Sequence, residues 1–163
     1  MKPQYRTRAA DHATWQRVLL MAGAVLMLAA IAWSLRPASV AAAEITVYRS
    51  PSCGCCGNWV EHLRKHGHKV TVRNSDNMSR IKMIAGVPDA LQSCHTAIAG
   101  DYVIEGHVPA RDIERLLAER PRQAGLAVPG MPAGSPGMEG GAPEPYQVIL
   151  FSSDGKQKVY ARY

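Results

Sequence analysis

Four cysteines dominate the chemistry that this 163-residue chain could perform. Three of them, Cys53, Cys55 and Cys56, lie within the run Pro51-Ser-Cys-Gly-Cys-Cys-Gly57, and Cys94 follows much later, directly before a histidine. Three thiols within four residues cannot all be buried as small apolar side chains, and they cannot all pair with one another. The spacing therefore indicates redox chemistry or the binding of a soft metal ion.

Thiolates this close together repel one another, and either oxidation to a disulfide or a soft cation would relieve the repulsion. A disulfide oxidoreductase needs only two thiols, such as the Cys-x-x-Cys pair Cys53 and Cys56, so the additional thiol of Cys55 favours a metal. Sulfur ligands select Cu(I) or Zn(II). Structural zinc sites usually show two well-separated ligand pairs, a pattern that is missing here, so copper is predicted and zinc is less favoured. Neighbouring thiolates could also bridge several copper ions in a small polynuclear site.

The first 43 residues have the features of an export signal. A basic segment precedes an apolar run from Val18 to Trp33, and the small residues Ala41–Ala43 follow. We expect cleavage before Glu44, in a bacterial protein that is exported to the periplasm. The alternative is an uncleaved anchor, but the apolar run is shorter than the ~20 residues that span a bilayer.

The basic character of the chain belongs mainly to this segment. Residues 1–43 hold five of the 19 Lys and Arg and one of the 13 Asp and Glu, which leaves 14 and 12 and a net charge of +2. No basic stripe with interleaved aromatic residues remains, so nucleic-acid binding is excluded. We expect contact with a membrane only through the export signal.

The pattern of residues 44–120 predicts a thioredoxin-like α/β fold. The cysteine-rich loop falls at its first strand-to-helix junction, where a Cys-x-x-Cys pair is a strong redox or metal signal. The expected order is a strand at 45–48, a helix from Trp59 to Gly67, a strand at 70–72, a helix capped by Ser75 and Asp76 and ending at Gly86, strands at 96–99 and 102–105, and a helix between Pro109 and Pro121.

This topology makes a spatial prediction. We expect the third strand to be antiparallel to the first and the fourth strand to be antiparallel to the third. Cys94 and His95, which precede the third strand, then lie at the same edge of the sheet as the cysteine-rich loop that follows the first strand. His107, which follows the fourth strand, reaches the same edge. Four thiols and two imidazoles should therefore converge there. Thiols at the start of a helix should also have lowered pKa values.

Residues 121–163 are expected to pack on the same domain. They comprise a Pro/Gly-rich tract with Met131 and Met138 and a terminal hairpin, 146–151 and 158–163, around Ser152–Gly155. Either the two methionines fill gaps in a loop or their thioether sulfurs supply further Cu(I) ligands. At ~3.3 Å per extended residue, the tract is long enough to return to the thiol edge.

His62 and His66 are four residues apart on the first predicted helix. They could form a surface metal pair, although solvated side chains are the commoner outcome for exposed histidines. His95 and His107 are the better candidates for ligands because of their expected place beside Cys94.

Five segments carry a resemblance to a known family. They are Ser-Pro-Ser-Cys-Gly-Cys-Cys-Gly-Asn-Trp at 50–59, Gly-Val-Pro at 86–88, Ser-Cys-His-Thr-Ala at 93–97, Glu-Gly-His-Val-Pro-Ala at 105–110 and Gly-Leu-Ala-Val-Pro-Gly-Met-Pro at 125–132. Together they resemble the CopG-type family of exported bacterial metal-binding proteins, long catalogued as a domain of unknown function.

The resemblance implies a periplasmic copper-resistance protein whose metal and redox centre consists of Cys53, Cys55, Cys56 and Cys94. In ordinary thioredoxins a proline precedes the third strand and shields the dithiol from metals, whereas Cys94 and His95 stand there in this chain. Two hypotheses follow. The protein binds Cu(I), buffering it or passing it to another periplasmic copper-handling protein, with thiol-coupled copper redox chemistry as an extension. Alternatively, it is a thiol–disulfide oxidoreductase in which Cys53 attacks and Cys56 resolves.

Overall fold

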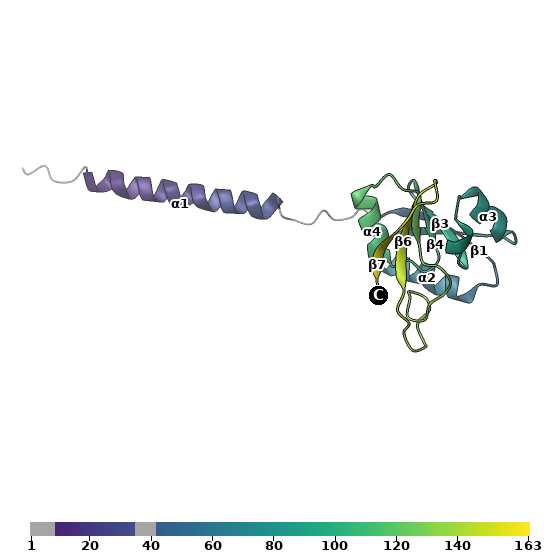
Figure 1. Ribbon diagram of the computed structural model, residues 1–163. Coiled ribbons are helices and arrows are strands. Elements are labelled where there is room, and N and C mark those ends of the chain that lie inside the picture. Colours follow the sequence, from purple (N-terminus) through teal and green to yellow (C-terminus); the bar gives the residue numbers. More distant parts are fainter. Residues whose placement is uncertain (1–8, 35–41) are drawn as a thin grey trace, which may run out of the picture. The chain divides into compact units, whose positions relative to one another are not determined.

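The computed structural model describes residues 9–34 and 42–163, which form two separate units (Figure 1). The first unit is helix α1 (Ala9–Ser34); of the predicted export signal, this helix and residues 42 and 43 are described, and the rest lies outside the described residues. Among the helices that are described, none is both long enough and apolar enough to cross a membrane.

The second unit is built on one mixed sheet of seven strands, in the order β2-β1-β3-β4-β5-β6-β7. Strand β1 is antiparallel to β3, and β4 is antiparallel to β3, as the sequence predicted; β1 is also parallel to β2. The elements of this unit, in chain order, are β1 (Glu44–Arg49), α2 (Gly54–Lys65), β2 (Lys69–Asn74), α3 (Met78–Ile84), a 3-10 turn (Asp89–Leu91), β3 (His95–Ala99), β4 (Tyr102–Glu105), α4 (Ala110–Glu119), β5 (Gly125–Ala127), β6 (Gln147–Phe151) and β7 (Gln157–Arg162).

Helices α2 and α4 share one hydrophobic core on one face of the sheet. Its fully buried members include Val47 of β1, Trp59 of α2 and Ile113 of α4. The indole Nε1 of Trp59 donates a hydrogen bond to the carbonyl oxygen of Val108 at 2.9 Å. This bond ties α2, whose start carries the cysteine motif, to the segment that leads from β4 into α4.

Helix α3 packs on the opposite face. Side chains alternate between the two faces of a strand, and Tyr48 of β1 and Ile98 of β3 alternate with the core residues of their strands. Together with Ile81 and Ile84 of α3 they line a cavity of about 280 Å³. The sheet is therefore covered by helices on both sides, which confirms the predicted α/β class.

Helix α2 begins earlier than the sequence predicted, at Gly54 instead of near Trp59. Cys53 is the N-cap residue with an extended backbone, and Cys55 and Cys56 lie in the first helical turn. The motif is thus part of the helix start and not a separate loop. Apolar periodicity begins only at Cys56, so the pattern could not mark the first polar turn.

Strand β5 is not predicted by the sequence pattern, because its three residues lie in the Pro/Gly-rich tract. It pairs in parallel with β4 and antiparallel with β6. A Cβ atom on Gly125 would lie 1.8 Å from the carbonyl oxygen of Val103, so only glycine permits this close pairing. Strand β5 thereby connects the terminal hairpin to the central strands.

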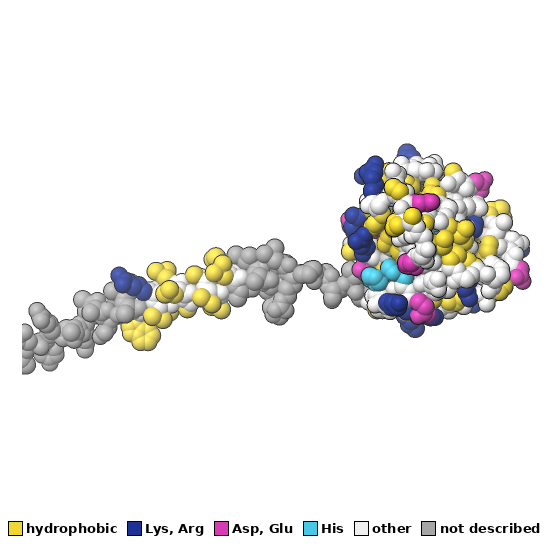
Figure 2. Space-filling model, turned by 90° about the horizontal axis from the view of Figure 1, so that it is seen from below, with side chains coloured by type: hydrophobic (Ala, Val, Ile, Leu, Met, Phe, Trp, Pro, Cys, Tyr) yellow, Lys and Arg dark blue, Asp and Glu magenta, His cyan; other side chains and the backbone are white. Residues whose placement is uncertain are grey.

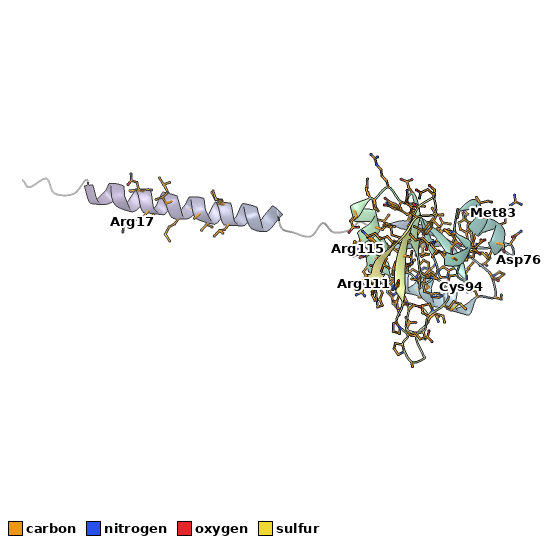
Figure 3. All side chains as sticks on the ribbon, in the orientation of Figure 1. Arg17, Asp76, Met83, Cys94, Arg111 and Arg115 are labelled. Carbon is orange, nitrogen blue, oxygen red and sulfur yellow. A yellow bond between two sulfur atoms is a disulfide. The ribbon has the colours of Figure 1, made fainter. Side chains whose placement is uncertain are left out.

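The terminal hairpin of β6 and β7 is confirmed, and it also contacts α4 (Figure 3). The guanidinium groups of Arg111 and Arg115 stack over the rings of Tyr163 and Tyr160, with the Arg carbon Cζ 4.5 and 3.7 Å from the ring centroids. Such cation–π contacts add to apolar burial. Residues 121–163 therefore complete the same sheet as residues 44–120.

Candidate metal centre

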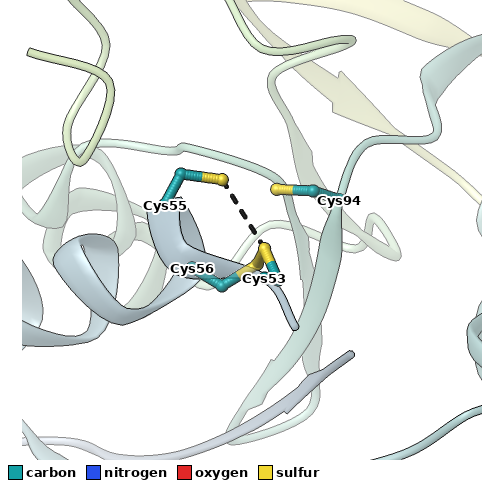
Figure 4. A group of neighbouring side chains, drawn as sticks. All are labelled: Cys53, Cys55, Cys56 and Cys94. Atoms are coloured by element: carbon teal, nitrogen blue, oxygen red, sulfur yellow. Dashed lines mark hydrogen bonds between the residues drawn. A yellow bond between two sulfur atoms is a disulfide. The ribbon is translucent and has the colours of Figure 1, made fainter. Parts of the chain in front are cut away.

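The first part of the site is the start of α2. Cys53 and Cys56 form a disulfide with a Cα–Cα distance of 5.5 Å, whereas Cys55 and Cys94 are free thiols. The Sγ atoms of Cys53 and Cys55 are 3.5 Å apart (Figure 4). Arg49, the last residue of β1, donates from Nη1 to the carbonyl oxygen of Cys53 at 2.8 Å, which fixes the turn between strand and helix.

Cys94 reaches the same place from the loop before β3. Its ligand atom and those of Cys53, Cys55 and Cys56 all lie within 4.8 Å of one another. Figure 4 shows the Cys94 side chain pointing from the backbone just before β3 toward the helix start that carries the other three. The predicted convergence of sulfur atoms 41 residues apart in sequence is present, since β1 and β3 pair in antiparallel register with Arg49 opposite His95.

Two histidines extend the site at the Cys94 end. The Cys94 Sγ atom lies 3.1 Å from Nδ1 of His95 and 3.1 Å from Nε2 of His107. These three residues form a second group whose ligand atoms lie within 4.8 Å of one another. Cys94 is therefore shared by an all-cysteine group and a Cys-His-His group.

His107 is oriented as a metal-binding imidazole would be. Its Nδ1 lies 2.8 Å from the carbonyl oxygen of Pro136, which can only accept, so Nδ1 carries the proton. The lone pair of Nε2 is then directed at Cys94. Burial lowers the pKa of His107, which keeps the ring neutral. A neutral imidazole held through its other nitrogen is the form that coordinates metals.

His95 is more deeply enclosed. It is fully buried against Trp59, with the ring centroids 4.3 Å apart, and its Nε2 has no hydrogen-bond partner. Burial lowers the pKa of His95 strongly, and the nearby ring of His107, whenever it is protonated, and the charge of Lys82 lower it further. Of its two nitrogens, Nδ1 faces the Cys94 sulfur, so any contribution to a metal would come from Nδ1.

The pKa of the Cys94 thiol is raised to about 12, first by burial and then by the neighbouring Cys55 thiol. The direction is opposite to the lowering expected for thiols at a helix start, because Cys94 approaches that helix from a half-buried loop. Cys94 is thus a neutral thiol in the metal-free protein at neutral pH. A metal that binds it must displace a proton, so binding will be stronger at higher pH.

The Pro/Gly-rich tract returns to the site at residues 135–138. Besides the contact of Pro136 with His107, Gly137 lies against the first turn of α2: a Cβ atom there would be 2.7 Å from the Trp59 nitrogen and 3.0 Å from the Cys55 carbonyl oxygen. Met138 is half-buried, and the Met131 side chain is 52% exposed. Their predicted role as ligands stays a prediction.

The predicted His62–His66 pair is adjacent, with ring centroids 4.7 Å apart, and Figure 2 shows histidine side chains at the surface of the folded unit. However, Nε2 of His62 accepts a hydrogen bond from the Ala110 backbone N–H at 3.1 Å. The proton of neutral His62 must then be on Nδ1, which leaves no free nitrogen for a metal. His62 instead caps the start of α4, whose N-cap residue Pro109 offers no side-chain acceptor.

Sequence analysis did not identify a group of buried polar residues that contact the loop carrying Cys94. Glu105 and Lys82 form an ion pair with side chains 0% and 6% exposed. Their positions 23 residues apart, one in a predicted helix and one at a predicted strand end, give no periodic signal. The only available sequence signal was the place of Glu105 directly before the Gly-His-Val-Pro turn.

The folded unit is thus an α/β protein with a cysteine-rich site and adjoining histidines at one end of its central strands. Sulfur and imidazole donors suit a soft metal ion. Residues 91–138 match a family described as "Protein of unknown function, DUF411". No protein with a curated description matches the chain.

Two solved structures are similar to the chain at 46% identity. The one titled "Copper resistance protein copG- Form 2" has a TM-score of 0.72, with 75% of this chain and 98% of that chain covered. "Copper resistance protein copG- Form 1" has a TM-score of 0.70, with 74% and 96% covered. The chain therefore belongs to the CopG family of copper resistance proteins, and its cysteine group together with this membership suggests copper binding.

The histidines predict how stability depends on pH. Burial is the leading cause that lowers the pKa values of His62, His68, His95 and His107 below the ordinary 6.5. The unfolded chain therefore binds more protons than the folded one below pH ~6.5, and the stability that is present above this pH is lost as the pH falls. We expect the melting temperature of the metal-free protein to be lower at pH ~5.5 than at pH ~7.5.

The variant His62→Gln sharpens this test. Glutamine can still accept the Ala110 N–H but cannot titrate, so the difference in melting temperature between the two pH values should shrink. A melting temperature that rises on acidification, or an unchanged difference in the variant, would contradict the assignment.

Proposed function

We propose that this protein binds Cu(I) through the thiolates of Cys53, Cys55, Cys56 and Cys94 as part of copper resistance. The observation that carries the proposal is the gathering of all four sulfur ligand atoms within 4.8 Å. Membership in a family of copper resistance proteins favours copper over zinc. Thiolate donors prefer Cu(I) among the oxidation states of copper.

Histidines complete the proposed ligand set at the Cys94 end. His107 is the stronger candidate because its Nδ1 contact with Pro136 leaves Nε2 free toward Cys94. His95 is the second candidate through Nδ1. Because Cys94 belongs to both ligand groups, its sulfur could bridge two ions, and a polynuclear thiolate-bridged site is part of the proposal. Met131 and Met138 remain candidate outer ligands from the tract that covers α2.

The oxidation state of the cysteines controls the capacity of this site. The Cys53–Cys56 disulfide must take up two electrons and two protons before both sulfurs become thiols. Conversely, oxidation of the two thiols to the disulfide releases two protons to solvent and two electrons, which could reduce two Cu(II) ions to Cu(I). We propose this thiol-coupled step as the extension of binding, with delivery of Cu(I) to another periplasmic copper-handling protein as its use.

The first test measures Cu(I) binding to the reduced protein. Cys55→Ser and Cys94→Ser should each lower the number of Cu(I) ions bound per chain, because each removes a thiolate from the shared group. His66→Gln, an exposed change outside the group, is the matched control and should leave the number unchanged. Anaerobic titration with metal analysis and a free-thiol count gives the result, and an unchanged stoichiometry in both serine variants would refute the proposed site.

A second candidate function is thiol–disulfide exchange on exported proteins. The observation that favours it is the disulfide between Cys53, at the N-cap of α2, and Cys56, which is fully buried. In this arrangement Cys53 is the attacking thiol and Cys56 the resolving thiol.

Reduction of insulin disulfides under metal-free, reducing conditions separates the two functions. If the exchange reaction is physiological, the activity should survive Cys94→Ser and be lost in Cys53→Ser, because only the latter removes the attacking sulfur. A wild-type protein without activity would exclude this candidate and leave copper binding as the function of the cysteines.

We further propose that residues 1–43 are an export signal and that the folded unit acts in the periplasm. Ala43 donates its N–H to Nδ1 of His68 and accepts from the Lys69 N–H at 3.0 Å, so the predicted cut before Glu44 removes two hydrogen bonds. The mature protein should be recovered from the periplasm with its first residue at Glu44 or within about two residues before it. N-terminal sequencing checks this, and a membrane-bound protein that retains Met1 would refute it.

A further inference from the structure

Glu105, the last residue of β4, is a fully buried carboxylate directly behind the metal centre. Its Oε1 atom accepts hydrogen bonds from the Ser93 backbone N–H at 2.6 Å and from Nζ of Lys82 at 2.5 Å. Its Oε2 atom accepts from Oγ1 of Thr96 at 2.7 Å, and the same hydroxyl accepts from Lys82 at 3.1 Å. One carboxylate thus holds three groups, one each from α3, the loop before β3 and β3 itself.

Two of the groups held by Glu105 flank the Cys94–His95 dipeptide. Ser93 precedes it and Thr96 follows it, so the carboxylate fixes the backbone that carries the Cys94 sulfur at both ends. On the other strand, Gly106 donates its N–H to the His95 carbonyl oxygen at 3.0 Å, directly before His107. The same carboxylate therefore sets the position of Cys94 relative to both candidate histidine ligands.

The close fit of this loop leaves little tolerance for movement. A Cβ atom on Gly106 would lie 2.6 Å from the Cβ and Oγ atoms of Ser93 and 2.6 Å from the Val128 carbonyl oxygen, so the Ser93 side chain packs closely against Gly106. The Ser93 hydroxyl also donates to the Gly130 carbonyl oxygen. A shift of the Ser93 N–H away from Glu105 would thus move Cys94 with it.

The ion pair is poorly explained by stability alone. Burying a charged pair incurs a desolvation penalty that often exceeds the attraction, and apolar residues of similar volume frequently hold two elements together equally well. What an apolar pair cannot do is accept a directed hydrogen bond from the Ser93 N–H. The distinctive effect of Glu105 is therefore on the geometry of the Cys94 loop.

We propose that Glu105, supported by Lys82, is a positioning residue that holds Cys94 in place for metal binding, an inference that rests on the function proposed above. Groups that orient metal ligands typically change affinity about 10- to 100-fold when they are removed. Loss of the carboxylate acceptor should therefore weaken Cu(I) binding by about tenfold or more. The fold itself should persist.

Two double variants separate the hydrogen bond from the charge. Lys82→Met with Glu105→Gln removes both charges but keeps a carbonyl oxygen that can accept the Ser93 N–H, so Cu(I) affinity should stay close to wild type. Lys82→Met with Glu105→Met also removes the acceptor, and its affinity should fall. Glu105→Asp keeps the charge but moves the carboxylate back by one methylene, so its Cu(I) affinity should fall as well. If the double methionine variant does not fold, this variant tests whether a well-placed acceptor is needed.

A thiol measurement on the metal-free protein gives a second readout that does not need copper. Cys94 is half-buried, so its alkylation by iodoacetamide, followed by peptide mass mapping, reports how firmly the loop is held. Alkylation of Cys94 should be faster than in the wild type in Glu105→Asp and in the variant with methionine at both positions 82 and 105. In Lys82→Met with Glu105→Gln, the alkylation rate should be unchanged. If wild-type protein binds no Cu(I), the function proposed above fails, while the alkylation rates still test the role of Glu105.

A final set of variants tests whether Glu105 affects Cu(I) affinity through Cys94. In a Cys94→Ser background the affinity difference between the methionine and glutamine variants should disappear. A difference of the same size in that background would assign the effect to the general fold and overturn the proposal. Wild-type affinity and wild-type alkylation in the folded methionine variant and in Glu105→Asp would overturn it equally.

Discussion

The antiparallel pairing of β1 with β3 is the constraint on which the rest of the site depends. The register that places Arg49 opposite His95 brings the residues after β1 and those before β3 to one end of the sheet. The helix start after β1 supplies Cys53, Cys55 and Cys56, and the loop before β3 supplies Cys94. A slip of one residue would turn the Cys94 side chain to the other face, so backbone pairing in the sheet controls the sulfur geometry.

The site also combines demands that conflict. Burial and the neighbouring Cys55 thiol raise the pKa of Cys94, so this sulfur is a neutral thiol where a metal would need a thiolate. The disulfide between Cys53 and Cys56 satisfies two sulfurs by oxidation, and a soft cation would satisfy all four by neutralisation. The same geometry therefore supports both redox chemistry and metal binding, and the two states exclude each other at Cys53 and Cys56.

Segments that lack chemistry of their own prepare the site. The tract at residues 135–138 fixes the tautomer of His107 and, through Gly137, covers the first turn of α2. His62, which looked like half of a metal pair, instead caps α4 and so supports the turn that carries His107. The buried contacts of Glu105 secure the Cys94 loop from behind. In each case a residue far away in sequence sets the orientation of a candidate ligand.

The sequence by itself determined the cysteine cluster, the α/β class, the terminal hairpin and the family, because these depend on local spacing, apolar periodicity and motif. It also predicted the convergence of Cys94 with the other cysteines, since the order of strands implies their directions. Only the tertiary structure revealed β5, where a three-residue strand relies on the missing side chain of Gly125, and the role of His62. It alone joined Lys82 to Glu105, because a buried ion pair between distant elements is set by their packing and leaves no pattern along the chain.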